Sequence, residues 1–430
     1  MDFNSFIVFL MLAIPMVWQV ISPFVLRKRI KLYSPIFFLT LFLSYYTLIP
    51  FIKGVHVVNG RNIDEGVPLY FFANFLSYTA TIIGFNLKTK WRIFNKYNDY
   101  VSELNAKRMG IVLMLIAISV YGIFRDWNFN LFFTTLESEN FELVERENHM
   151  EYYLTQLSML FIAASCCLYV SYRRNKTKLL WVCLVFEMLV ALMEGFRATI
   201  AIFIISFAVF FQNYPKLKSL NLKLWLPIGL VFLLSLGAME RSRTYGRGYN
   251  IDVIMEMFSD GSYTESAGES ATLYGDGAMT MAKFTETGDR YYFEPVLCAL
   301  LQPIPRAWFP LKPNADYLRD AGTKVNGFKG NVVITSPIEA FISFGWFGII
   351  IYGLFVGWLC RVFWNNYITN REKIGALILL ASFNAFLYVY VSRGYMAQVL
   401  VTYMYVVIIP FWVIKILLKF VSFLRIEKNK

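Results

Sequence analysis

Residues 178–214 read KLLWVCLVFEMLVALMEGFRATIAIFIISFAVFFQNY, and this stretch decides the fold class. Two apolar segments, 178–193 and 198–214, flank the short sequence Glu194-Gly195-Phe196-Arg197. A glycine between charged residues interrupts an apolar helix more readily than it continues one. The stretch therefore predicts a hairpin of two membrane-crossing helices rather than a single long helix.

The composition of the whole chain agrees with a membrane protein. Of the 430 residues, 57% are hydrophobic and 16% are charged, and the mean hydropathy is +0.50. Aromatic residues reach 18%, which suits aromatic belts at two bilayer interfaces. The net charge of +12 is spread over short basic clusters beside apolar segments, where topology and anionic lipid explain it. We therefore expect contact with membrane lipid and no nucleic-acid partner.

Apolar segments of suitable length occur eleven times along the chain, since a membrane-crossing helix requires about 20 apolar residues. They are 5–26, 34–52, 68–87, 109–125, 153–172, 178–193, 198–214, 224–240, 335–360, 374–392 and 396–419. The sequence predicts an all-α polytopic membrane protein with about 11 transmembrane helices. Helices 1–8 would occupy 1–240, and helices 9–11 with a cytoplasmic tail would occupy 335–430. Residues 241–334 are too long for a plain connector, so we expect a large extracytoplasmic loop with short helices.

The loops between these segments alternate between basic and acidic. Because positive charge collects in the cytoplasm, the alternation predicts an extracytoplasmic N-terminus and a cytoplasmic C-terminus. The predicted outer side carries 11 Arg and 5 Lys, whereas the inner side carries 9 Arg and 16 Lys. The planar fork of arginine suits bidentate contact with phosphate or carboxylate. The skew predicts anion recognition on the outer face, although pairing with nearby acids explains most of these arginines.

Four basic residues stand where the outer chain is tightly constrained. Arg197 and Arg393 lie in short turns between apolar segments, and Arg197 opens a helix, where free N–H groups and the helix dipole favour an anion. Arg306 and Lys312 lie in a proline-rich segment whose backbone is stiff. We predict that Arg197, Arg306 and Arg393 are catalytic and that Lys312 and Glu194 bind substrate. The alternative for Arg197 is an interfacial arginine that pairs with Glu194.

Another cluster of arginines, Arg241, Arg243 and Arg247, follows the eighth apolar segment on the outer side. We expect Arg241 or Arg243 to contact substrate, and contact by all three is not expected. The chain has two histidines, five cysteines without a CxxC pair, and no P-loop, GxGxxG, HExxH or DxD pattern. These patterns predict neither a metal site nor a bound cofactor.

Three acidic positions have competing interpretations. Ser336-Pro337-Ile338-Glu339 has the pattern of a helix-capping box, and a general base at Glu339 is the alternative. Glu187 lies within an apolar segment, which makes it a functional candidate, although it can equally bond a neighbouring tyrosine or serine. Gly275-Asp276-Gly277 is interpreted as a turn.

Four stretches carry a resemblance to a known family: EGFRATIAIFIISF (194–207), IPRAWFPLKP (304–313), TSPIEAFISFGWFG (335–348) and SRGY (392–395). In order and position they resemble bacterial Wzy-type O-antigen and oligosaccharide repeat-unit polymerases. The resemblance implies a GT-C-like glycosyltransferase of the bacterial inner membrane that needs no metal. Its arginines would match Arg197, Arg306 and Arg393 here, while the bulky Phe196 departs from the family's Gly-small-Arg turn.

The resemblance also implies the substrate and the partners. We expect undecaprenyl-diphosphate-linked oligosaccharides as substrates, polymerised on the extracytoplasmic face, and a chain-length regulator protein as a possible partner. An O-antigen ligase would share the fold and the donor, and a lipid-linked oligosaccharide flippase would also carry cationic groups. The sequence leaves these two alternatives open.

Overall fold

A computed structural model describes the chain over residues 3–26, 34–58, 60–89, 105–125, 156–194, 197–214, 268–302, 304, 308–309, 316–327, 332–371 and 373–417. Helices make up most of these residues. The helices are α1 (Phe3–Val25), α2 (Pro35–Ile52), α3 (Val67–Asn86), α4 (Ala106–Arg125), η3 (Gln156–Met159), α7 (Leu160–Asn175), α8 (Leu179–Glu194), α9 (Arg197–Asn213), α12 (Gly268–Thr287), α13 (Glu294–Leu301), α14 (Asp316–Asn326), α15 (Ser336–Thr369), α16 (Ile374–Ser392), α17 (Met396–Tyr403) and η5 (Met404–Ile408). Strands β1 (Val57–Val58) and β2 (Arg61–Asn62) pair in antiparallel fashion.

Seven helices in the described residues are long and apolar enough to cross a membrane: α1, α2, α3, α4, α15, α16 and the segment Met396–Leu417 that contains α17. This confirms an all-α, membrane-embedded protein. Helices α7, α8 and α9 occupy three further predicted segments with 16, 16 and 17 residues, fewer than the usual span of about 20. The eighth predicted segment, 224–240, lies outside the described residues. The count of eleven and the GT-C-like arrangement therefore stay predictions.

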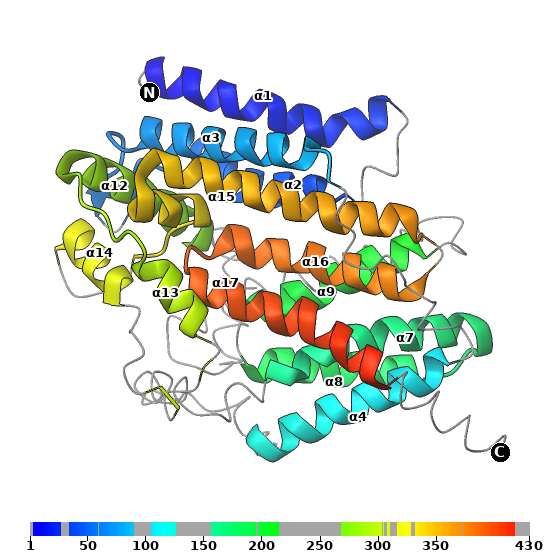
Figure 1. Ribbon diagram of the computed structural model, residues 1–430. Coiled ribbons are helices and arrows are strands. Elements are labelled where there is room, and N and C mark those ends of the chain that lie inside the picture. Colours follow the sequence, from blue (N-terminus) through cyan, green and yellow to red (C-terminus); the bar gives the residue numbers. More distant parts are fainter. Residues whose placement is uncertain are drawn as a thin grey trace, which may run out of the picture.

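Helix α16 occupies the centre of the bundle (Figure 1). It is apolar on all sides, and nearly all of its side chains are buried. Helices α9 and α2 pack along it, α1 covers α2 and α3, and α4 packs on α7 at the opposite side. The predicted hairpin is present as α8 and α9, which end and begin at Glu194 and Arg197 and pack on each other.

Helices α3 and α15 approach each other closely because glycines line their contact. A Cβ atom at Gly357 would lie 2.1 Å from the Thr81 carbonyl oxygen, and one at Gly84 would lie 2.3 Å from the Leu354 carbonyl oxygen. Gly353 and Gly357 form a GxxxG pattern, which is common where membrane helices meet. Dispersion between backbones therefore holds α3 and α15 together.

Helix α15 contains a break that the sequence did not predict. Phe344 and Gly345 have non-helical dihedral angles, and Gly345 has φ of 65°, a conformation that favours glycine. The N–H groups of Tyr291 and Tyr292 donate to the carbonyls of Ile342 and Ser343 at 2.9 and 3.0 Å. The segment 336–343 is thus a short helical piece at the end of the bundle, joined to the long membrane-crossing part.

Helices α12, α13 and α14 belong to the stretch 241–334 that was predicted as a large loop. They gather at one end of the bundle, where α3, α15 and α17 begin and α16 ends (Figure 1). Short helices were expected there, but α12 has 20 residues and packs against α2, α3 and α15. The described part of this stretch is therefore built into the bundle rather than laid loosely over it.

Candidate functional site

Two chain segments meet at this end of the bundle. The first, 332–339, leads into and includes the start of α15, and the second, 390–396, runs from the end of α16 through the turn to the first residue of α17. The hydroxyl of Ser336 donates to the carbonyl of Tyr390 and, at 3.1 Å, to that of Arg393. We call this contact the α15–α17 junction. It brings together two of the four stretches that carry the family resemblance, TSPIE and SRGY.

Gly394 allows the two segments to come this close. Its N–H donates to the Ile334 carbonyl oxygen at 2.6 Å. A Cβ atom at this position would lie 2.6 Å from the carbonyl oxygens of both Ile334 and Thr335, where no side chain fits. The glycine of SRGY is therefore explained by packing at the junction.

Glu339 ties the junction to α14. It is 0% exposed, and its Oε1 accepts hydrogen bonds from the Tyr317 hydroxyl at 2.5 Å and from the Met396 N–H at 2.8 Å. No described residue donates to its Oε2. Burial raises the pKa of Tyr317, and the neighbouring Glu339 raises it further, so Tyr317 remains a donor. One carboxylate thus fixes a helix and a turn that lie far apart in the sequence.

The capping-box interpretation of 336–339 is wrong. Thr335 is the N-cap residue of α15 and makes no side-chain capping bond, and Ser336 is already helical. The Ser336 hydroxyl bonds to carbonyls at the end of α16, and Glu339 bonds to Tyr317 and Met396. Both side chains therefore serve long-range contacts instead of the helix start.

Arg393 and Arg197 lie at the same end of the bundle. Arg393 directly follows α16 and is half-buried at the junction. Arg197 is the first residue of α9, which packs along α16, and the other end of α9 is fixed where the Tyr367 hydroxyl donates to Asn213 Oδ1 at 3.2 Å. Tyr367 lies near the end of α15, just before α16 begins, so α9 runs antiparallel to α16. The two predicted arginines therefore share one end, as the anion-site prediction requires.

The structure does not place four of the other predicted site residues. Arg306, Lys312, Arg241 and Arg243 lie outside the described residues, and Arg247 does too. For Glu194 and Arg197 the structure describes the main chain only. Convergence of Arg306 with Arg197 and Arg393 stays a prediction.

Asp276 is a buried acid at this end that the sequence interpretation missed. Its Oδ2 accepts a hydrogen bond from the Val333 N–H at 2.9 Å, which fixes the segment before α15. Burial raises the pKa of Asp276 to about 6, although the bond from Val333 lowers it in part. The predicted turn at 275–277 is wrong, because these residues lie within α12. Their glycines permit close packing: a Cβ at Gly277 would lie 2.6 Å from the Tyr70 ring.

Two arginines of the predicted outer side, Arg61 and Arg290, bond to main-chain carbonyls. The Arg61 guanidinium donates to the carbonyls of Val325 and Asn326, which are free because α14 ends there. Arg290 donates to the Phe284 carbonyl at 2.8 Å, and its guanidinium lies 4.5 Å from the centre of the Phe341 ring. Arginines of the predicted outer side thus also satisfy the carbonyls of helix ends, which weakens the excess of arginine on that side as a signal of anion binding.

Glu187 is buried on α8, and no described residue donates a hydrogen bond to either of its oxygens. Its surroundings include Ser165 and Cys166 of α7 and Cys183 of its own helix. Glu187 and these neighbours therefore belong to the α7–α8 pair and form no part of the α15–α17 junction.

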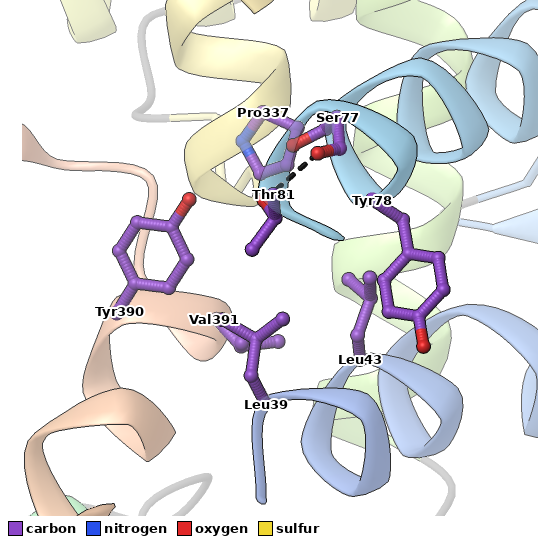
Figure 2. Close-up of a pocket in the computed structure, with 8 residues that line it drawn as sticks. All are labelled: Leu39, Leu43, Ser77, Tyr78, Thr81, Pro337, Tyr390 and Val391. Carbon is purple, nitrogen blue, oxygen red and sulfur yellow. Dashed lines mark hydrogen bonds between the residues drawn. The ribbon is translucent and has the colours of Figure 1, made fainter. Parts of the chain in front are cut away.

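A small cavity lies behind the junction, between α2, α3, the start of α15 and the end of α16 (Figure 2). Its volume is about 10 Å³, room for a single water molecule. Its lining is Leu39, Leu43, Ser77, Tyr78, Thr81, Pro337, Tyr390 and Val391. It is too small to hold a lipid diphosphate or a sugar.

Compared with known proteins, the chain matches no protein-family model, no curated protein sequence and no solved structure. Its class follows from the fold: an all-α, membrane-embedded protein with a buried, hydrogen-bonded junction at one end of the bundle.

Proposed function

We propose that this protein polymerises undecaprenyl-diphosphate-linked oligosaccharide repeat units into a surface polysaccharide on the extracytoplasmic face of a bacterial inner membrane. The observation that carries the proposal is the α15–α17 junction, where the TSPIE and SRGY stretches of the family resemblance are bonded to each other. The resemblance places Arg393 in the anion site, and this contact fixes the turn that bears it. In this proposal the N-terminus lies outside and the C-terminus in the cytoplasm.

The proposed reaction transfers the growing glycan between carriers. A hydroxyl oxygen of the incoming unit forms a bond to the anomeric carbon, and the bond from that carbon to the diphosphate oxygen breaks. The hydroxyl proton passes to a base, and negative charge builds on the departing diphosphate. Guanidinium groups at Arg197, Arg306 and Arg393 would stabilise that charge, and loss of one such donor costs about 10²–10³-fold in rate.

Glu339 is better suited to a positioning role than to the role of base. It is fully buried under Tyr317, and its Oε1 already binds the Tyr317 hydroxyl and the Met396 N–H. Abstraction of a substrate proton would require α14 to move away first. In our proposal Glu339 holds the SRGY turn, and therefore Arg393, in place.

The first experiment measures polysaccharide length in a strain whose own copy is deleted and replaced by a variant. Arg197→Lys should fold normally and lose most polymer, because a point charge does not replace the planar fork. Surface glycans of a single repeat unit are the expected result, and full-length polymer would contradict the proposal. Lipid-linked polymer stranded in the membrane would indicate a ligase, and repeat units retained in the cytoplasm would indicate a flippase.

A matched pair of substitutions separates the two roles of Glu339. Glu339→Gln retains an acceptor oxygen for Tyr317 and Met396, so a positioning residue keeps most of the polymer. Glu339→Leu removes that acceptor and should shorten the polymer. If Glu339→Gln abolishes polymerisation while the protein remains folded, Glu339 is the base.

A further inference from the structure

Helix α13 is apolar on every side, although it is too short to cross a membrane. It has eight residues, and its only charged residue, Glu294, lies in the first turn. Pro295, Cys298 and Ala299 are buried on one face. A short helix on a water-exposed surface normally turns polar residues outward.

The outward face of α13 is a stripe of large apolar side chains. Leu297 and Leu300 of α13, with Phe293 just before the helix and Ile304 just after it, are spaced three or four residues apart. Phe293, Leu297, Leu300 and Ile304 are 66, 51, 61 and 37% exposed. Tyr292 and Trp308 extend the same chain segment and are 61 and 70% exposed. Exposed apolar area that is this continuous marks a contact with another molecule or with a membrane.

This stripe continues the surface of a membrane-crossing helix. The Phe293 ring packs edge-on against the Phe344 ring of α15, with centroids 5.1 Å apart. From there Phe347, Ile351 and Phe355 are exposed along the membrane-crossing part of α15. The buried face of α13 packs on α17, the first part of another membrane-crossing segment.

The boundary with water lies just before α13. Lys324 of α14 forms ion pairs with Asp289 at 3.1 Å and Asp320 at 3.0 Å, and all three side chains are partly exposed. The Tyr291 hydroxyl donates to Asp320 at 2.6 Å. The charged residues Asp289, Arg290 and Glu294 lie at this boundary, and the apolar stripe begins beside them at Phe293. An exposed tyrosine such as Tyr292 at this boundary suits the headgroup level of a bilayer.

We propose that α13 lies in the membrane interface, with its outward stripe in contact with the acyl chains of bilayer lipid. The occupant is the bilayer, because the stripe is continuous with the lipid-facing surface of α15. Helix α14, one connection further along the chain, stays in water. This inference is independent of the polymerase proposal, because it uses no substrate and no catalytic residue.

The experiment uses the full-length protein in phosphatidylcholine nanodiscs, with a single cysteine introduced at Leu297 or Leu300 and labelled with a fluorophore. The matched controls are cysteines at Arg319 and Thr323, on the exposed face of α14. Cys166, Cys167, Cys183, Cys298 and Cys360 are buried, so labelling of the unsubstituted protein measures the background.

Quenching by lipid carrying a nitroxide near the headgroup should be several-fold stronger at Leu297 and Leu300 than at Arg319 and Thr323. A water-soluble quencher should show the reverse order. Equal access of the aqueous quencher to both helices would overturn the proposal. Protection of Leu297 and Leu300 from both quenchers, together with cross-linking between copies, would assign the stripe to a second copy instead and would also overturn it.

Discussion

Helices α13 and α14 come from the same stretch of chain and pack on the same end of the bundle, yet their outward faces are opposite. The exposed residues of α14 are Arg319, Asp320, Thr323 and Lys324, whereas those of α13 are Leu297 and Leu300. Both helices bury an apolar face, so burial alone does not distinguish them. In our proposal this difference sets the membrane–water boundary within this end of the bundle, because the outward face of α13 is apolar and that of α14 is charged.

The two helices also differ in what they do for the junction. Helix α14 covers Glu339 through Tyr317 and is fixed at its own end by Arg61. Helix α13 reaches the bundle through α17 and the break in α15. The junction is therefore covered by α14 and bordered by α13.

The largest effect is expected from a charge on the buried face of α14. Ala321 is 0% exposed, so Ala321→Asp places an unpaired carboxylate in the interface and should cost about 3–5 kcal/mol. Thr323→Asp on the exposed face of the same helix is the control and should stay within about 0.5 kcal/mol. Thermal unfolding of the purified protein measures both, and equal values for the two would mean that α14 is not docked.

The pH dependence of stability tests the burial of Asp276 at this end of the bundle. Because burial raises its folded-state pKa to about 6, its contribution to stability is complete below about pH 4 and is lost as the pH rises through 6. The loss amounts to roughly 3 kcal/mol at neutral pH. Asp276→Asn should remove this dependence, so that wild type and variant differ more at pH 8 than at pH 4. A melting temperature with the same pH dependence in both proteins would contradict the assignment.

The outward faces of α13 and α14 can be compared by introducing a lysine into each of them. Leu300→Lys would place a charge in the lipid interface and should destabilise the protein by about 1–3 kcal/mol, less than at a bilayer centre. Thr323→Lys adds the same charge to a water-exposed face and should be nearly neutral. Unfolding in nanodiscs measures the pair, and a neutral Leu300→Lys would remove the contrast between the helices.

The smallest effect is expected at the ion pairs of Lys324. Partial burial lowers the pKa of Lys324, but its hydrogen bonds with Asp320 and Asp289 outweigh this and raise the pKa. Since these groups are partly exposed, Lys324→Met should cost less than about 1 kcal/mol. The difference between wild type and variant should shrink as salt is added, because exposed charges are screened. A difference that is insensitive to salt would place these charges away from water.

Part of this architecture was accessible from the sequence, because hydrophobic periodicity and length act locally. The segments around α1, α2, α3 and α16 were predicted within a few residues, and the hairpin of α8 and α9 followed from its central glycine. The break at Phe344 and Gly345 was not predicted, since it depends on donors from Tyr291 and Tyr292. Local patterns carry no information about such donors.

Local sequence patterns were a poorer guide to the candidate site than to the helices. Glu339 and Arg393 were predicted next to turns at the ends of apolar segments and both lie at one end of the bundle, but the local explanation of Glu339 as a helix cap was wrong. Asp276 was missed because its flanking glycines indicate a turn when neighbours are ignored. Within α12 those glycines instead admit Val58 and Tyr70.

The sequence by itself determined that this chain enters a membrane, because about 20 consecutive apolar residues have no favourable place in water. It also determined most of the membrane-crossing segments and the candidate residues in the turns between them. Only the tertiary structure decided that Glu339 binds Tyr317 and Met396, that Gly394 lies against Ile334, and that α13 packs on α17. These are contacts between residues distant in sequence, and packing of the whole chain selects them.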